Sequence, residues 1–277
     1  FTNGLVAYYP FDGNASDMSG NGNHGTVNGG ATLGADRHGI AGKAYSFDGV
    51  DDYVRVPHHS SLNFGGNSFT LSTWVYARAN TGRILNKSTG DHIYSLEAFV
   101  ADASIGEVSF LLRDTYPNTA YVKGSTTLAD QQWHLISGVR DAEANKILVY
   151  QDGVLVSTQS FSGNVSNSAD LLIGSANHSP VNFDGLLDEV RIYNRALSAA
   201  EVAALYQLEN TTPPNQAPVF SGSSTFTTAE NNASASFLVT VTDPDANTTL
   251  VYAKSGPNAD KFTLNVATGT LTFVNTP

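Results

Sequence analysis

Apolar and polar residues alternate along much of the chain, the period-two pattern that is typical of half-buried β-strands. Residues 69–76 place phenylalanine, leucine, threonine and valine on one face and tryptophan and tyrosine on the other. Residues 133–139 have a similar pattern, and both tryptophans, Trp74 and Trp133, are expected in the core. The runs 146–151 and 154–157 flank Asp152-Gly153, a pair that supplies the positive φ angles of a tight type I′ turn. The pattern therefore predicts strands joined by at least one hairpin.

Three further segments, 108–113, 171–174 and 186–193, complete the set of strongly predicted strands. Several strands carry apolar residues on both faces, as strands in stacked sheets do. The fold class expected from this pattern is all-β, with two antiparallel sheets packed as a sandwich. One helix is predicted over residues 198–206, because Ser198 and Glu201 form a capping box ahead of an alanine-rich run.

The helix is expected to close a first domain over residues 1–209. Residues 210–218 contain three prolines, no charge and no periodicity, and therefore predict a linker. Short β-rich runs resume in residues 219–277, but only 68 residues follow position 209. A complete sandwich needs about 100 residues, so we expect the second domain to be partial.

Composition and charge remove several classes of function. The 277 residues include 14 Lys and Arg against 25 Asp and Glu, which gives a net charge of −11 and argues against nucleic-acid binding. No apolar run approaches the roughly 20 residues of a membrane span, so membrane insertion is not expected. Cysteine is absent, which excludes disulfides, cysteine-based zinc sites and cysteine nucleophiles. An acidic, cysteine-free chain that starts at Phe1 is typical of a mature or excised part of a bacterial secreted or cell-surface protein.

Ordered motifs in the first domain resemble those of laminin G-like domains with the concanavalin A-like jelly-roll fold. The resemblance covers about residues 3–207. It rests on segments 4–12, 17–25, 45–54, 69–75, 133–134, 152–153 and 183–198. The family contains sugar-binding modules, adhesion modules and some polysaccharide-degrading enzymes, so its fold does not fix an activity. The resemblance implies a concanavalin A-like two-sheet antiparallel jelly-roll sandwich.

The tail resembles a bacterial cadherin-like repeat. Its entry segment would be residues 215–220, its first acidic motif 229–231 and its Asp-x-Asp motif 241–245, while 262–271 would supply later strands. The entry lacks the acidic residues of the usual linker between repeats. The resemblance implies a partial cadherin-like or Ig-like β domain.

Carboxylates and amides gather in glycine-rich turns, where Ca²⁺ finds side-chain and carbonyl oxygens together. The predicted calcium ligands are Asp12, Asp17, Asn23, Asp48 and Asp188, and Asn21, Asp51 and Asp52 lie in the same kind of turn or at a strand end. The resemblance implies that a structural calcium ties the loop after the first strand to the last strand, with Asp12 and Asp188 as a pair. The alternative is that these residues cap their own backbone in Asx turns.

The resemblance also places ligand-binding loops at residues 79–92 and 175–184. Sugar recognition uses planar donors and acceptors for hydroxyl groups and an aromatic face for C–H stacking. The candidate residues are Arg83, Asp91, His92, Tyr94, Tyr116, Asn177, His178 and Asp184, with Phe183 as a further aromatic. Arg83 and Lys87 would also suit an acidic polysaccharide. The alternative is that these loops are polar only because loops generally are.

Catalytic motifs are not found in the sequence: it has no metalloprotease helix, nucleophile elbow, phosphate loop or closely spaced carboxylate pair on a strand. A polysaccharide lyase could use His92, Tyr94, Arg113 and Tyr116. His134, beside Trp133, is expected to pack within the sandwich.

The sequence favours a secreted, non-catalytic, calcium-stabilised polysaccharide-binding module of a larger extracellular enzyme or adhesin. Further repeats or catalytic domains of the same parent chain are expected beside it. A polysaccharide lyase or hydrolase and a protein-binding adhesion domain are the two alternatives.

Overall fold

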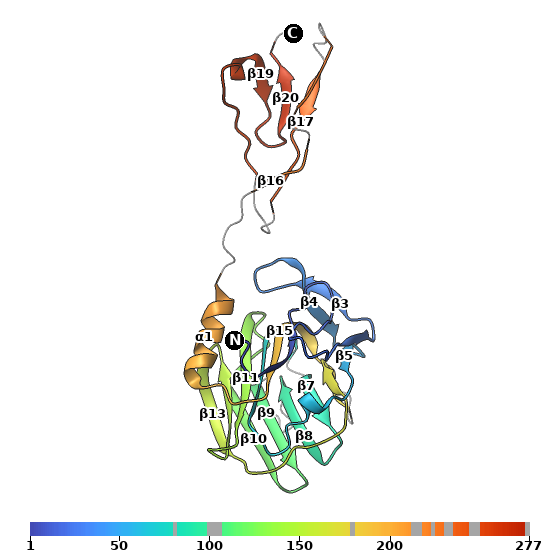
Figure 1. Ribbon diagram of the computed structural model, residues 1–277, viewed down its shortest axis with the longest axis vertical. Helices are drawn as coiled ribbons and strands as arrows, with labels where there is room; N and C mark the ends of the chain where they lie inside the picture. Colours follow the sequence, from blue (N-terminus) through green and yellow to red (C-terminus); the bar gives the residue numbers. More distant parts are fainter. Residues whose placement is uncertain are drawn as a thin grey trace. The chain divides into compact units, whose positions relative to one another are not determined.

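The computed structural model describes residues 1–79, 82–98, 107–177, 181–211, 218–222, 225–229, 235–243 and 250–274. The chain divides into two compact units, residues 1–211 and residues 212–277 (Figure 1). In the described part of the chain no helix is long and apolar enough to cross a membrane.

The first unit is an antiparallel β-sandwich (Figure 1), as the alternating pattern predicted. One sheet runs in the order β13 (Val154–Ser160), β12 (Lys146–Gln151), β11 (Trp133–Asp141), β6 (Phe69–Ala77), β15 (Asp184–Tyr193), β4 (Ala41–Asp48) and β3 (Thr32–Ala35), and β1 (Leu5–Tyr9) also pairs with β15. The other runs in the order β10 (Thr119–Thr127), β9 (Glu107–Asp114), β8 (His92–Glu97), β7 (Arg83–Ser88), β14 (Leu171–Ile173), β5 (Tyr53–Val56) and β2 (Thr26–Asn28).

The main core lies between the two sheets and follows the predicted faces. Phe69, Leu71 and Val75 of β6 point into it and are fully buried. The ring of Phe69 packs against Tyr94 of β8 at 5.3 Å and Phe110 of β9 at 6.0 Å between centroids. Burial of such large rings supplies much of the stability of a sandwich.

A second, smaller core lies on the other face of the eight-stranded sheet, beneath α1 (Ala199–Asn210). Ser198 caps this helix and forms the predicted capping box with Glu201. Trp74 projects from β6 toward the helix, where its Nε1 donates to Glu209 Oε2 at 2.8 Å. Trp74 is 2% exposed, whereas Trp133 is only partly buried and packs against the same cluster.

His134 lies on β11, on the same face of the sheet as its register partner Val75 of the main core, and it is partly buried. It reaches the β12–β13 hairpin, where Asp152 and Gly153 both have the positive φ angles that the turn requires. Its Nδ1 is 2.7 Å from Asp152 Oδ2 and its Nε2 is 3.1 Å from Asp130 Oδ2. The hydrogen bond to Asp152 raises the pKa of His134. Burial lowers this pKa by less, and the hydrogen bond to Asp130 also raises it.

The raised pKa predicts how stability depends on pH. Protonated His134 stabilises the fold fully below the ordinary histidine pKa of about 6.5, and this contribution is lost as pH rises through the higher folded value. The free energy of unfolding should therefore fall between pH 6 and 8 by more in the wild type than in His134→Gln. Urea unfolding at several pH values measures this difference, and parallel pH profiles for the two proteins would contradict the prediction.

The second unit contains two small sheets within its described residues. β16 (Val219–Phe220) pairs with β18 (Val241–Thr242), and β17 (Ser236–Leu238), β20 (Thr270–Phe273) and β19 (Phe262–Leu264) form the other. Phe237 contacts the rings of Phe226 and Phe273. Residues 215–217, 230–231 and 244–245 of the proposed repeat motifs lie outside the described residues, so the cadherin-like repeat stays a prediction.

Candidate functional site

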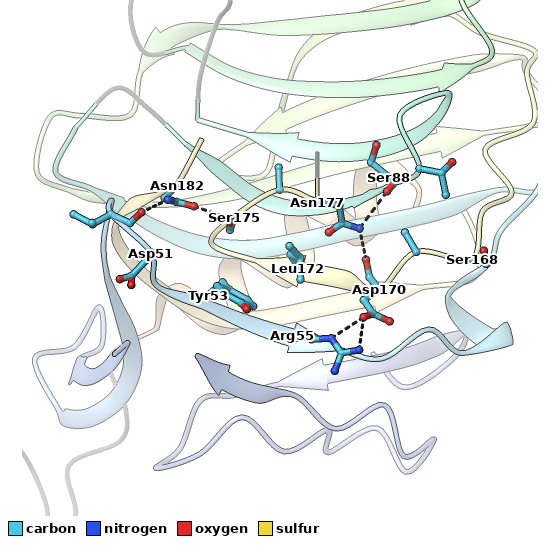
Figure 2. Close-up of a pocket in the computed structure, with 14 residues that line it drawn as sticks. Asp51, Tyr53, Arg55, Ser88, Ser168, Asp170, Leu172, Ser175, Asn177 and Asn182 are labelled. Atoms are coloured by element: carbon cyan, nitrogen blue, oxygen red, sulfur yellow. Dashed lines mark hydrogen bonds and ion pairs between the residues drawn. The ribbon is translucent and has the colours of Figure 1, made fainter. Parts of the chain in front are cut away.

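An open pocket of about 700 Å³ lies on the outer face of the seven-stranded sheet, over β5 and β14 (Figure 2). Strand alternation explains its floor. Val54 and Val56 of β5 point into the core, so Tyr53 and Arg55 point outward. Leu172 of β14 also faces outward and stands opposite Arg55 in the strand register.

Four loops complete the wall of the pocket. They are the turn after β4, the end of β7 and the loops on either side of β14. The remaining lining residues are Val50, Asp51, Ser88, Thr89, Ser168, Ala169, Asp170, Ser175, Ala176, Asn177 and Asn182. Figure 2 shows Tyr53 and Leu172 between a group around Asn182 and a group around Asp170. The pocket thus combines an apolar floor with two polar sides.

Arg55 and Asp170 form an ion pair on one side of the pocket. Arg55 Nε and Nη2 lie 2.7 and 2.6 Å from Asp170 Oδ2. The other carboxylate oxygen of Asp170 accepts a hydrogen bond from the backbone N–H of His58 at 2.8 Å. These bonds fix the orientation of the pair. The Arg55 side chain is 51% exposed, so the pair remains accessible to a ligand.

Two asparagines hold the loops in place. Asn177 Nδ2 donates to the carbonyl oxygens of Asp170 and Ser88, at 2.9 and 3.2 Å, and so joins the two loops that flank β14 to the end of β7. Asn182 accepts from Ser175 Oγ at 2.6 Å and donates to the carbonyl oxygen of Val50. These bonds pre-organise the polar rim, which lowers the entropy cost of binding.

A group of three carboxylates stands beside the pocket. Asp48, Asp51 and Asp52 each place an oxygen within 4.8 Å of the other two, and Asp51 also lines the pocket. We call this group the carboxylate triad. Burial, together with the neighbouring charges of Asp48 and Asp51, raises the pKa of Asp52. Gly29 packs so closely on this turn that a Cβ there would lie 2.1 Å from the Asp51 carbonyl oxygen.

Asp12 and Asp188, the pair implied for calcium, each have a cationic partner of their own. Asp12 is exposed and pairs with Lys43 at 3.1 Å. Asp188 is 2% exposed and pairs with Arg37 at 2.6 Å. Burial raises the pKa of Asp188 to about 8, with Glu189 acting in the same direction and Arg37 in the opposite one. Each carboxylate therefore already has its own cation.

Asp17 and Asn23 organise the loop after β1. Asp17 accepts hydrogen bonds from the backbone N–H groups of Tyr8, Ser19 and Asn23, each at 2.9 Å. Asn23 Nδ2 donates to the carbonyl oxygen of Val6 at 2.7 Å. Burial alone would raise the pKa of Asp17, but the backbone hydrogen bonds outweigh it and lower the pKa. Asp17 thus caps the backbone of its own loop, which was the alternative to calcium binding for these residues.

Replacing Asp17 with alanine should lower the free energy of unfolding by about 2–4 kcal/mol, because three backbone donors lose a charged acceptor. The lowered pKa means that this stabilisation is present above about pH 4 and is lost as pH falls through the folded value. Urea unfolding at pH 7 and pH 3 measures both effects. Asp12→Ala is the control and should change stability by less than about 0.5 kcal/mol; equal effects of the two changes would contradict this role.

The predicted ligand residues are dispersed over the first unit. Asn177 lines the pocket. Asp184 pairs with Arg78 at 3.2 Å, and Arg83 pairs with Glu97. His178 lies outside the described residues.

Three other candidates belong to turns at the ends of β8 and β9. Asp91 precedes β8 and its carbonyl oxygen accepts from Thr115 N–H at 3.2 Å. His92 contacts the Asn164 carbonyl oxygen at 3.0 Å, and Tyr116 is 78% exposed. These residues form a separate surface that does not line the pocket.

Tyr94 is a core residue, and its expected stacking role is corrected. Its ring is fully buried and its hydroxyl donates to the Leu62 carbonyl oxygen at 3.0 Å. Tyr94 is therefore not accessible to a substrate, and the lyase set of His92, Tyr94, Arg113 and Tyr116 loses that member. Lys87 and Phe183 are also fully buried; Lys87 Nζ donates to the Asn167 carbonyl oxygen at 2.6 Å.

Sequence reasoning missed Tyr53, Arg55 and Asp170. The signal for the first two was present, because residues 53–56 alternate an aromatic and a cation with two valines. Asp170 carried no such signal, since it meets Arg55 only through the pairing of β14 with β5.

Known proteins support the fold. The binding domain of paraclostridial mosquitocidal protein 1 superposes with a TM-score of 0.64 at 18% identity, over 75% of this chain and 53% of that chain. Domain 4 of AbnA, a GH43 extracellular arabinanase from Geobacillus stearothermophilus in complex with arabinotriose, has a TM-score of 0.59 at 26% identity. That match covers 73% of this chain and 98% of the arabinanase domain. The chain is thus similar to nearly the whole of one sugar-complexed domain and about half of the toxin domain.

Sequence comparisons give a family. The adhesion G-protein coupled receptor V1 of Danio rerio is 28% identical over 188 residues, which are 64% of this chain but only 3% of the receptor. The profile Laminin_G_3, described as the concanavalin A-like lectin/glucanases superfamily, matches residues 48–203, more than half of the chain. The chain therefore belongs to the laminin G-like group of the concanavalin A-like lectin/glucanases superfamily.

Proposed function

We propose that the first unit is a non-catalytic carbohydrate-binding module and that the pocket over β5 and β14 is its binding site. The observation that carries the proposal is the apolar floor of Tyr53 and Leu172 beside the Arg55–Asp170 pair and Asn177. A sugar ring presents C–H groups on its face and hydroxyls at its edge, and this floor and rim match them. The similarity to an arabinanase domain in complex with arabinotriose supports the same class of ligand.

Binding by this site needs no reacting group. The ion pair offers donors and acceptors to neighbouring hydroxyls, while the asparagine amides fix the loops that carry them. A pocket of about 700 Å³ that opens to solvent accommodates a short stretch of a polysaccharide chain. The module would hold a larger protein on a polymer, and its affinity would gain from repetition.

We further propose that Ca²⁺ binds the carboxylate triad rather than the pair Asp12 and Asp188. Calcium prefers several oxygen ligands, and carboxylates this close together repel one another unless a cation shares them. Neither Asp48, Asp51 nor Asp52 forms an ion pair with a described Lys or Arg. Asp51 belongs to both the triad and the pocket, so the ion would also stiffen the wall of the binding site.

Calcium removal tests this second proposal. EDTA should lower the melting temperature of the protein, and added Ca²⁺ should restore it, because the ion binds only the folded triad. Asp51→Asn/Asp52→Asn should lose this response. Asp17→Asn and Asp12→Asn are the comparison variants, and they should keep the response. A wild-type melting temperature that EDTA leaves unchanged would contradict the calcium site.

The setting we propose is a secreted or cell-surface protein, as part of a larger extracellular enzyme or adhesin. The similarity to an extracellular arabinanase and to an adhesion receptor supports it. The second unit would act as a spacer or as one unit of a repeat stalk.

Depletion from solution by insoluble polysaccharides tests the proposed function. The full chain is mixed with arabinan, xylan, agar and cellulose, and the unbound protein is measured. At least one polymer should deplete the wild type, and reducing ends should not accumulate in the same tubes. Release of reducing ends would favour a hydrolase, and absorbance of unsaturated products a lyase. The absence of depletion by every polymer would contradict carbohydrate binding and favour the adhesion-domain alternative, which the receptor match supports.

A further inference from the structure

Charges around the pocket bear on which glycans it accepts. Arg55 is the only Lys or Arg among the described lining residues, while Asp51 and Asp170 are both acidic. Arg55 is already neutralised by Asp170 at 2.6 Å. The lining therefore carries a net charge of −1, with Asp51 as the unbalanced group.

Other cations of the first unit, outside the lining, are also engaged. Arg78 pairs with Asp184, and Arg83 pairs with Glu97. Lys87 is fully buried, with Nζ held 2.6 and 2.9 Å from the two oxygens of Asn167. Arg113 donates to the Gly90 carbonyl oxygen and the Thr119 hydroxyl. An anionic sugar would have to compete with a carboxylate or a structural hydrogen bond for nearly every one of these groups.

Carboxylates extend the negative charge beyond the lining. Asp48 and Asp52 of the triad adjoin Asp51, and the whole chain carries −11. A divalent cation in the triad would offset two of its three charges and leave the sign unchanged. The local potential and the overall potential therefore act in the same direction on an approaching polymer.

We infer that the pocket selects neutral glycans and rejects uronate-rich or sulfated ones, with Asp51 and the Arg55–Asp170 pair as the selecting groups. This inference rests on the proposed function. It reverses the expectation that Arg83 and Lys87 would suit an acidic polysaccharide. The ion pair binds neighbouring hydroxyls through charge-assisted hydrogen bonds. Asp51, whose charge no lining cation balances, repels carboxylated or sulfated sugars.

Titration of the full chain with neutral and acidic polymers tests the inference. Arabinan and xylan are compared with polygalacturonate and alginate at about 20 and about 500 mM NaCl, which bracket weak and strong screening. The affinity for a neutral polymer should differ by no more than about two-fold between the two salt concentrations. At low salt, each acidic polymer should bind at least about ten-fold more weakly than the neutral polymer does. Acidic binding as tight as neutral binding would overturn the inference and leave carbohydrate binding intact. Failure of all four polymers, and of agar and cellulose as well, to bind would count against both proposals.

A gain-of-function variant isolates the selecting groups. Asp51→Asn/Asp170→Asn changes the charge of the lining from −1 to +1. With all proteins compared in EDTA, so that no ion bound by the carboxylate triad differs between them, this variant should bind polygalacturonate at low salt, with an affinity that falls as salt increases. Asp141→Asn/Asp260→Asn removes the same number of carboxylates outside the pocket and should still reject that polymer. If both double variants bind it equally, overall charge rather than the pocket controls selection. Near-UV circular dichroism establishes that the variants are folded.

Discussion

Replacing Trp74 with alanine is expected to lower the free energy of unfolding of the first unit by about 3–5 kcal/mol. The indole is almost fully buried between β6 and α1. It stacks on Tyr206 with centroids 5.7 Å apart, and the Arg37 guanidinium lies 5.0 Å from the ring centroid. Alanine would leave a cavity and remove the donor to Glu209, so the helix would lose one of its buried contacts with the sheet.

Urea unfolding measures this loss of free energy, and far-ultraviolet circular dichroism follows it without relying on the tryptophan signal that the substitution removes. Trp74→Phe keeps most of the packing but leaves the buried Glu209 Oε2 without the indole donor, and should cost about 1–3 kcal/mol. Trp133→Ala is the matched control at a partly buried tryptophan and should cost less than Trp74→Ala. A loss below about 1 kcal/mol for Trp74→Ala would show that α1 does not depend on this contact.

The second large effect is on binding. Tyr53→Ala should weaken the affinity for a neutral oligosaccharide by about ten-fold or more, because the aromatic part of the pocket floor contributes roughly 1–2 kcal/mol. The residue lies on the outer face of β5, so stability should change little. Tyr53→Phe keeps the ring and should retain most of the affinity.

Tyr116→Ala is the matched control for this experiment. Tyr116 is the most exposed tyrosine of the predicted ligand surface, at 78%, and does not line the pocket. Isothermal titration calorimetry of Tyr53→Ala, Tyr53→Phe and Tyr116→Ala compares the pocket directly with the turns of β8 and β9. A larger loss in Tyr116→Ala than in Tyr53→Ala would place the ligand at the turns of β8 and β9 instead.

The alternation of residue types predicted the fold because successive side chains of a strand point to opposite faces of its sheet. In β6 it identified both the core face and the face that carries Trp74. The capping box of α1 was also readable, since Ser198 and Glu201 are local in sequence. Tyr94 was misplaced because it follows a ligand loop implied by the resemblance and was therefore taken as a stacking aromatic, whereas in the structure it belongs to β8 and points inward.

Site residues were harder to predict because they meet through strand register and loop contacts. Arg55 and Asp170 are 115 positions apart and become partners only when β14 pairs with β5. Asp12, Asp17 and Asp188 have the residue type of a calcium ligand, yet each already interacts with a cation or with backbone donors. Residue type indicated the chemistry, while three-dimensional neighbours decided which carboxylates stand together.

Nuclear magnetic resonance titration of the full chain with arabinotriose tests most directly whether the pocket binds sugar. Backbone amide shifts should move around Tyr53, Arg55 and Leu172, and the side-chain amide of Asn177 should move with them. The same titration of Tyr53→Ala should need about ten-fold more sugar to reach equal shifts. Shifts confined to Asp91, His92 and their neighbours, or no shifts at millimolar sugar, would contradict the assignment of the pocket as the glycan-binding site.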